Sequence, residues 1–198
     1  MIVGDVGTGK TKLMAELLEE AIALGFSRRI SVLDCAPSIK PPDVSVGSPL
    51  ESFSEAVKSV RRLPLKKIYA PRLMARSAEE ALELATGNKG SIDRALEEFL
   101  RSPTKILFVN DISLYFQVGG FSKLEDVFFA VETFVATGYF GERLAEDHGS
   151  GISRHERTMM ERLMDRMNVV IRLPRDLETG QGAVEVEEPS KEGDCEVS

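Results

Sequence analysis

The sequence predicts an α/β fold, in which helices cover both faces of a mainly parallel central sheet to form a three-layer sandwich. Short apolar runs of strand length alternate along the chain with longer segments whose apolar residues recur at helical spacing. A chain of 198 residues with an ordinary balance of apolar and charged side chains is long enough to bury one substantial core. We therefore expect one domain over residues 1–184 and an acidic, disordered tail over 185–198.

The first half of the chain opens with the apolar segment Met1-Ile2-Val3, read as a strand. A buried central strand usually has about five or six residues, so either the sheet tolerates a short centre or the natural protein starts upstream of Met1. A helix is expected over 10–24, where the apolar spacing is helical and Gly25 can end it. The other elements expected here are a strand over 30–33, a loop over 38–48, a helix over 51–60 and a strand over 67–70.

The second half contains the clearest central strand, over 106–109, with Asn110 and Asp111 at its end. Two helices are expected before it, over 77–85 and 91–100, because the segment Thr86-Gly87-Asn88-Lys89-Gly90 would interrupt a helix. The elements expected after it are a helix over 124–132, a strand over 133–137, a loop over 138–151, a helix whose start carries the capping box Ser153-x-x-Glu156, a strand over 169–171 and an edge strand near 183–186.

The segment from Gly4 to Thr11 has the pattern G-x-x-x-x-G-K-T, which is typical of a phosphate-binding loop. Its glycines allow backbone N–H groups to form a nest for anionic oxygens, and the following helix directs its positive end at the same place. Lys10 would reach the outer phosphates, and the Thr11 hydroxyl would bind a magnesium ion. We expect ATP to be bound by Gly4, Asp5, Val6, Gly7, Thr8, Gly9, Lys10, Thr11 and Lys12.

A second motif is the apolar strand that ends at Asp111. A carboxylate at the carboxyl end of a strand, behind a phosphate-binding loop, is suited to hold magnesium directly or through water. The alternative is that Asp111 only caps the next turn. We expect Mg2+ to be held by Thr11 and Asp111.

With these motifs, nearly the whole expected domain resembles a RecA/KaiC-type ATPase of the additional-strand P-loop class. The resemblance implies that a further strand separates the P-loop strand from the Asp111 strand, and that its polar tip senses the γ-phosphate. The matching strand here is 133–137, which makes Thr137 the sensor candidate. The segment 166–173 is also similar to the last strand of KaiC-like proteins.

Hydrolysis needs a carboxylate that orients or deprotonates the attacking water. Many members of this class have a glutamate directly after the magnesium-binding aspartate, but this chain has Ile112 there. RecA-like proteins instead carry a glutamate at the tip of the strand after the P-loop helix, and the residue at that position here is Asp34. Asp34 is therefore the candidate catalytic base, with a magnesium-shell or strand-capping role as the alternatives, and we expect slow turnover.

Other nucleotide-binding classes fit the sequence less well. ParA- and MinD-like ATPases place a signature lysine where this chain has Asp5. The N-K-x-D motif of GTPases is absent, since the segment Asn88-Lys89-Gly90-Ser91 fails at its last position. ATP is therefore preferred over GTP.

Partners are less well defined than the nucleotide. A basic run between Lys58 and Arg76 could follow a nucleic acid, but we favour a solvated helix face in a chain of net charge −7. Either Arg154 or Arg157 could complete the site of a neighbouring subunit in a homo-oligomer or other protein assembly, or could pair with nearby glutamates. The two distant cysteines favour reduced thiols and a cytoplasmic protein, and no segment is expected to insert into a membrane.

The sequence thus predicts a Mg2+-dependent ATP-binding protein, a slow RecA/KaiC-like ATPase that acts as a switch or motor in an assembly. One alternative is a small-molecule or nucleotide kinase, in which the segment 138–157 would form an arginine-rich lid. Another is a nucleotide-dependent binding module that does not hydrolyse ATP, which the isoleucine at position 112 would suit.

Overall fold

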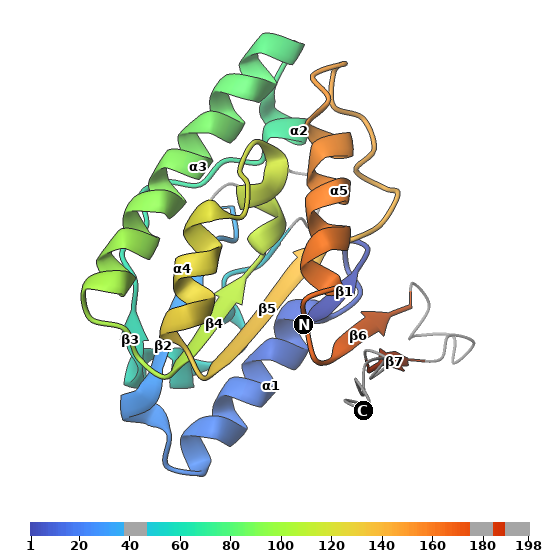
Figure 1. Cartoon of the computed structure of the whole chain (residues 1–198). Helices are drawn as coiled ribbons and strands as arrows, with labels where there is room; N and C mark the ends of the chain where they lie inside the picture. The colour runs from blue at the N-terminus through green and yellow to red at the C-terminus, as the bar shows by residue number, and fades with distance from the viewer. Residues whose placement is uncertain (38–46, 175–183, 189–198) are drawn as a thin grey trace, which may run out of the picture.

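The computed structural model describes residues 1–37, 47–174 and 184–188 and is built on a seven-stranded sheet of order β3-β2-β4-β5-β1-β6-β7 (Figure 1). All neighbouring strands are parallel except β6 and β7, which are antiparallel. The strands are β1 (Ile2–Gly4), β2 (Ile30–Asp34), β3 (Arg61–Arg62), β4 (Ile106–Asn110), β5 (Thr133–Tyr139), β6 (Val170–Leu173) and β7 (Glu185–Glu187). The mainly parallel sheet is as predicted.

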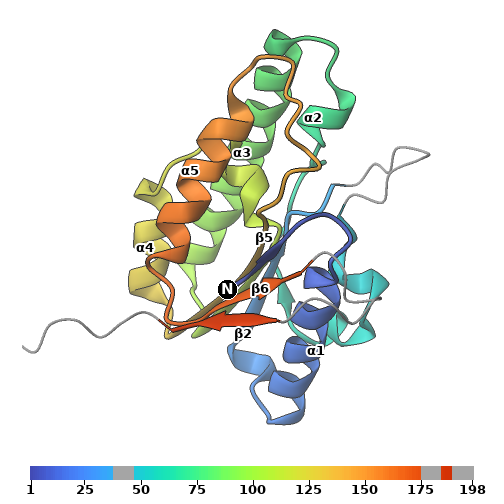
Figure 2. The same cartoon turned by 90° about the vertical axis from the view of Figure 1, so that its right-hand side faces the viewer.

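Helices cover both faces of this sheet, which gives the three layers predicted from the sequence (Figure 2). The helix α1 (Lys10–Ala23) covers one face and packs on the core around Met14 and Leu18. The other face is covered by α3 (Ala78–Arg101), α4 (Ser122–Ala130) and α5 (Ile152–Met164), and a short helix α2 (Pro71–Met74) precedes α3. No helix in the described part of the chain is long and apolar enough to cross a membrane.

The strand order places β5 between β1 and β4, as predicted for the segment 133–137. In register, Ile2 lies beside Thr137 and Val109 lies beside Ala136. Because parallel strands end at the same edge of a sheet, the ends of β1, β4 and β5 meet there. The three-residue strand β1 is paired on both sides, and Ile2 is only 1% exposed.

Two expectations for the segment 51–70 are wrong. Residues 51–60 form no α-helix but two 3-10 turns (Leu50–Ser52 and Glu55–Ser59), because Ser54 between them is extended and its Oγ accepts a hydrogen bond from the Ala56 N–H. Residues 67–70 form no strand, because the side-chain amide of Asn88 bonds both the N–H and the carbonyl of Tyr69, each at 2.9 Å. A side chain thus takes the place of a neighbouring strand.

The two helices expected around residues 86–90 are one continuous helix, α3, so the predicted break is wrong. Gly87 and Gly90 each cost about 1 kcal/mol relative to alanine in a helix. Tertiary packing offsets that cost: α3 buries Ala85, Asn88 and Ile92 on the side that faces the protein.

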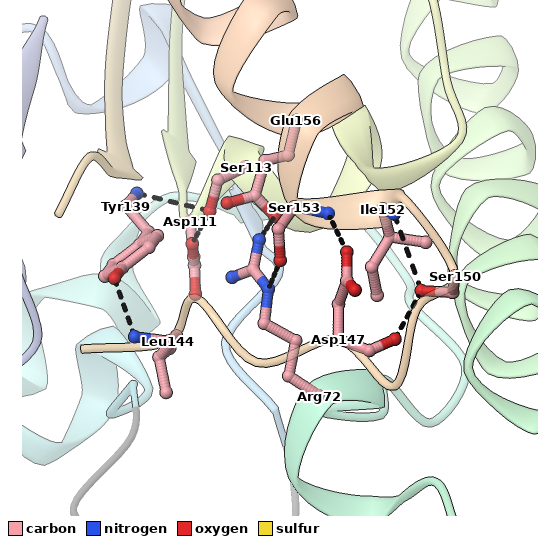
Figure 3. A network of polar contacts seen from close by, with 10 residues as sticks. All are labelled: Arg72, Asp111, Ser113, Tyr139, Leu144, Asp147, Ser150, Ile152, Ser153 and Glu156. Atoms are coloured by element: carbon pink, nitrogen blue, oxygen red, sulfur yellow. Dashed lines mark hydrogen bonds and ion pairs between the residues drawn. The ribbon is translucent and has the colours of Figure 1, made fainter. Parts of the chain in front are cut away.

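The predicted capping box at the start of α5 is also wrong. The helix starts at Ile152 behind Gly151, and the Ser153 N–H donates to Asp147 Oδ2 at 3.0 Å. The Ser153 hydroxyl and Glu156 both turn to Arg72 instead (Figure 3). A contact between distant segments has replaced the local cap.

At the carboxyl end, residues 185–187 of the expected tail form the edge strand β7, so this part of it is ordered. Residues 189–198 of that tail lie outside the described residues, as do most of the loop expected over 38–48 and residue 183 of the expected edge strand.

Candidate functional site

A cavity of about 300 Å³ lies at the carboxyl ends of β4 and β5, between these strands and the start of α1. Most of the residues predicted to bind the nucleotide or the metal line it, although they come from distant parts of the sequence. The lining residues are Val6, Gly7, Thr8, Gly9, Lys10, Thr11, Lys12, Gly47, Ser48, Phe53, Asn110, Asp111, Thr137, Tyr139 and Leu144.

The loop over residues 4–11 has a backbone that needs glycine at three places, Gly4, Gly7 and Gly9. Gly9 is the residue before α1 and has φ 86°, in the left-handed region. A Cβ on Gly4 would lie 2.8 Å from the Leu173 carbonyl oxygen and 2.9 Å from Thr8 Oγ1. The pattern of glycines thus lets the loop lie tightly against β6 and enter the helix directly.

Lys10 holds its ammonium over this loop. Its Nζ donates to the carbonyl oxygen of Asp5 at 2.5 Å. Burial lowers the pKa of Lys10, and the negative charges of Asp111 and Asp5 partly oppose that shift. The hydrogen bond to Asp5 thus fixes the Lys10 side chain in the lining of the cavity.

Two residues predicted to contact the nucleotide, Gly4 and Asp5, do not line this cavity; they line a neighbouring one, of about 340 Å³. The carboxylate of Asp5 is tied to backbone, accepting from the Val6 N–H at 2.7 Å and from the Glu142 N–H at 3.3 Å. Asp5 therefore stabilises the conformation of the loop through these backbone hydrogen bonds. Lys12 lies at the mouth of the cavity, with its ammonium 4.0 Å from Glu16.

Thr11 and Thr137 meet at Asn110, a residue that sequence reasoning did not assign to the site. Their hydroxyls donate to Asn110 Oδ1 at 3.4 Å and 2.9 Å respectively. Thr137 Oγ1 also accepts from the backbone N–H of Asp111 at 2.9 Å. Side-chain alternation could have identified Asn110. Because every second side chain of a strand points to the same face, Asn110 lies on the same face of β4 as Phe108, which is the face that α1 covers.

Asp111 supplies a carboxylate to the same cavity. It follows β4 in the left-handed conformation (φ 59°, ψ 56°), which is uncommon for a residue with a side chain. Its Oδ1 accepts from Ser113 Oγ at 2.6 Å, and the Tyr139 N–H donates to Ser113 Oγ at 3.2 Å (Figure 3). Burial raises the pKa of Asp111, while the Ser113 hydrogen bond and the charges of Lys10 and Arg72 lower it.

The oxygen atoms of Thr11, Asn110 and Asp111 fit the chemistry of Mg2+, which takes oxygen ligands and keeps several waters. Within the described residues, no group of three or more His, Cys, Asp or Glu could hold a metal ion. The protein atoms alone would therefore coordinate such an ion incompletely.

Asp34 lies beside Asn110 in register but does not line the cavity. Its Oδ1 accepts from Asn110 Nδ2 at 2.8 Å and from the Ala36 N–H at 3.2 Å, and its Oδ2 accepts from the Leu50 N–H at 2.8 Å. Burial raises its pKa, and these hydrogen bonds oppose that shift. This geometry matches the strand-capping alternative, and the role of Asp34 as a base stays a prediction.

Behind Asp111, sequence reasoning also missed a buried ion pair between Arg72 and Glu156 (Figure 3). Arg72 belongs to the predicted basic run, but its side chain is only 6% exposed, whereas Lys58 and Arg62 of the same run form exposed ion pairs. No sequence signal marks the pair, because its members come from α2 and α5. Arg157 is exposed, with its guanidinium 4.4 Å from the Phe140 ring centre and its Nε 3.4 Å from Glu161.

Comparison of the chain with protein-family models found no matching model, and comparison with curated proteins found no significant match.

Proposed function

We propose that this protein binds ATP with Mg2+ in the cavity at the end of β4 and β5 and hydrolyses it slowly, as a RecA/KaiC-like P-loop ATPase that acts as a switch or motor in an assembly. The observation that carries the proposal is that Lys10, Thr11 and Asp111 line one cavity with the N–H-rich loop before α1. A cation, a hydroxyl, a carboxylate and a helix N-terminus then surround the space where a triphosphate would lie.

Each of these residues would have a distinct task. Lys10 would exchange its bond to the Asp5 carbonyl for the outer phosphates, which is a small movement for a flexible side chain. Thr11 and Asp111 would hold Mg2+, which would neutralise charge on the phosphates. Thr137, two residues before the end of β5, the strand between β1 and β4, would sense the γ-phosphate.

Two other residues, Ile112 and Asp34, favour slow turnover. Ile112 follows Asp111 and is fully buried, and both oxygens of Asp34 already accept hydrogen bonds. A water molecule would therefore be weakly activated until the site rearranges or a partner contributes a group. The partner would be a second copy of the chain or another protein, and Cys35, a buried free thiol, suits a reducing cytoplasm.

The deciding measurement is ATP binding by calorimetry, with Lys10→Ala compared with Lys105→Ala. Lys105 is exposed and pairs with Glu132 on the surface, so its loss is a matched removal of one positive charge. We expect Lys10→Ala to abolish ATP binding and Lys105→Ala to leave it unchanged. Equal affinity in both variants would exclude this cavity as the nucleotide site, and phosphate transfer only in the presence of an acceptor would favour a kinase.

A further inference from the structure

A second cavity, of about 320 Å³, lies beside the candidate nucleotide cavity, and the side chains of Tyr139 and Leu144 line both of them. The second cavity is enclosed by the segment after β5, the start of α5 and Arg72 of α2. Its volume is that of a small-molecule pocket, for which about 300–1,000 Å³ is usual. The loop over residues 4–11 contributes nothing to its lining, so the phosphate-binding motif does not account for this cavity.

Arginine side chains are concentrated around the second cavity, although the chain as a whole has a net charge of −7. Its lining includes the three arginines Arg72, Arg154 and Arg157 and the two glutamates Glu142 and Glu156. Glu156 is paired with Arg72, at 2.7 Å. The cations outnumber the carboxylates by one, and the cavity therefore attracts an anion.

Two of these arginines retain N–H groups for a ligand. Arg72 donates through Nε to Ser153 and through Nη2 to Glu156, and Figure 3 shows its third nitrogen directed away from both partners. Arg154 is exposed, and its guanidinium forms no ion pair with any residue that the structure describes. A guanidinium carries five N–H donors and binds a phosphate or a carboxylate through two of them at once.

The opposite wall of the second cavity is apolar and aromatic. It is formed by Tyr139, Phe140 and Leu144. The Arg72 guanidinium lies 5.3 Å from the centre of the Tyr139 ring, and that of Arg157 lies 4.4 Å from the centre of the Phe140 ring. Stacking of this kind orients a guanidinium, and the same aromatic wall offers a contact surface to the apolar body of a ligand.

Hydrogen bonds fix this wall in place. The Leu144 N–H donates to the Tyr139 hydroxyl at 2.8 Å, which closes the chain back on the end of β5. The Phe140 N–H donates to the Gly4 carbonyl at 3.0 Å. A wall that already has its shape without a ligand loses less conformational entropy when a ligand binds.

We propose that the second cavity binds a small organic anion. Its phosphate or carboxylate group would face the guanidinium groups of Arg72 and Arg154. Its apolar body would lie against the wall formed by Tyr139, Phe140 and Leu144. The inference goes beyond the proposed function and does not depend on it, because no residue of the loop over 4–11 takes part.

The test uses three probes of similar size on the full chain without ATP: phenyl phosphate, benzoate and the uncharged benzyl alcohol. Binding is followed by nuclear magnetic resonance of two methyl groups, since Ala145 lines only the second cavity and Val6 lines only the nucleotide cavity. We expect at least one anion to shift the Ala145 signal with a Kd of about 1 mM or lower. Benzyl alcohol should bind at least about tenfold more weakly. The comparison of the two anions identifies the preferred charged group.

Two arginine variants separate a specific contact from a general effect of charge. Arg154→Gln removes a lining cation from an exposed position, and we expect it to weaken binding of the anion by about tenfold. Arg143→Gln is the matched control, because Arg143 is also exposed and close in sequence but does not line the cavity. Its Kd should stay within about twofold of the wild-type value.

Four results would overturn the proposal. The first is no saturable shift of Ala145 in the wild type with either anion up to about 20 mM, which holds even if a variant does not fold. The second is a shift confined to Val6, which would place the anion in the nucleotide cavity. The others are equal binding of benzyl alcohol and equal weakening in both arginine variants. ATP binding is measured separately, so its failure would refute the proposed function and leave this inference standing.

Discussion

Arg72 and Glu156 form a buried ion pair directly behind the cavity carboxylate: Arg72 Nη2 lies 2.7 Å from Glu156 Oε2, and their side chains are 6% and 3% exposed. The guanidinium also donates through Nε to Ser153 Oγ at 2.9 Å and lies 5.3 Å from the centre of the Tyr139 ring. The pair therefore holds α2, α5 and the end of β5 together next to Asp111 (Figure 3).

Removal of one partner of this pair should strongly destabilise the fold. At a pH above the Glu156 pKa of about 7, Arg72→Met leaves the Glu156 carboxylate buried without its cation, and we expect a loss of about 3–5 kcal/mol in the free energy of unfolding, measured with urea at that pH. Adding Glu156→Met to it removes the stranded charge and should restore part of the loss. Lys105→Met is the control, since its exposed pair with Glu132 should contribute less than about 1 kcal/mol. A small effect of Arg72→Met would mean that the pair is open to water.

The same carboxylate predicts a pH dependence of stability. Burial raises the pKa of Glu156 from 4.5 to about 7, against the opposing effects of Arg72 and of a hydrogen bond from Gln117. Between these two pH values the folded state retains a proton that the unfolded chain has lost. The contribution of Glu156 to the free energy of unfolding should therefore be greatest below pH 4.5, fall as the pH rises to about 7 and stay constant above it.

Glu156→Gln isolates this effect, because it removes the titration and keeps the shape of the side chain. The difference in unfolding free energy between the wild type and this variant should change only between pH 4.5 and about 7. Asp34 also has a raised pKa, but it is present in both proteins and cancels in the difference, whereas Asp111, whose charge raises the pKa of Glu156, adds a smaller change of its own. A difference that does not vary with pH would show that Glu156 titrates normally.

Thr137 should separate ATP binding from hydrolysis if the proposed function holds. Its buried hydroxyl donates to Asn110 and accepts from the Asp111 N–H, so it positions both residues without lying on the loop over 4–11. Thr137→Val should leave ATP affinity within about threefold and lower the rate of phosphate release by roughly tenfold or more. Thr137→Ser keeps the hydroxyl and should release phosphate at nearly the wild-type rate; equal loss in both variants would indicate a packing effect.

The core of the fold could be predicted because its signals are local. The apolar runs at β2, β4 and β5 and the helical spacing of α1 are properties of neighbouring residues, and the loop motif fixes the start of α1. Two of the errors lie where a distant side chain decides the backbone. The amide of Asn88 bonds Tyr69 and replaces an expected strand, and Arg72 draws Glu156 away from an expected cap.

The candidate site likewise contains residues that local motifs predict and one residue that they do not. Lys10, Thr11 and Asp111 are predictable from motifs, since each lies next to a recognisable strand or helix end. Asn110 was missed because its importance comes from four partners spread over the chain, from Thr11 to Thr137. Side-chain alternation places Asn110 on the α1-facing side of β4, but these four hydrogen bonds themselves leave no pattern in the sequence.

The continuity of α3 can be tested at Gly87, where the sequence predicted a break. Gly87 lies inside the helix, and a Cβ added there would meet nothing within 4 Å. Gly87→Ala should therefore stabilise the protein by about 0.5–1 kcal/mol in urea unfolding, because alanine loses less backbone entropy than glycine in a helix. Gly4→Ala is the opposite case and should destabilise, since its Cβ would lie 2.8 Å from the Leu173 carbonyl oxygen. If Gly87→Ala instead destabilised the fold, the chain at residues 86–90 would have to leave the helical conformation, and two separate helices would be the better description.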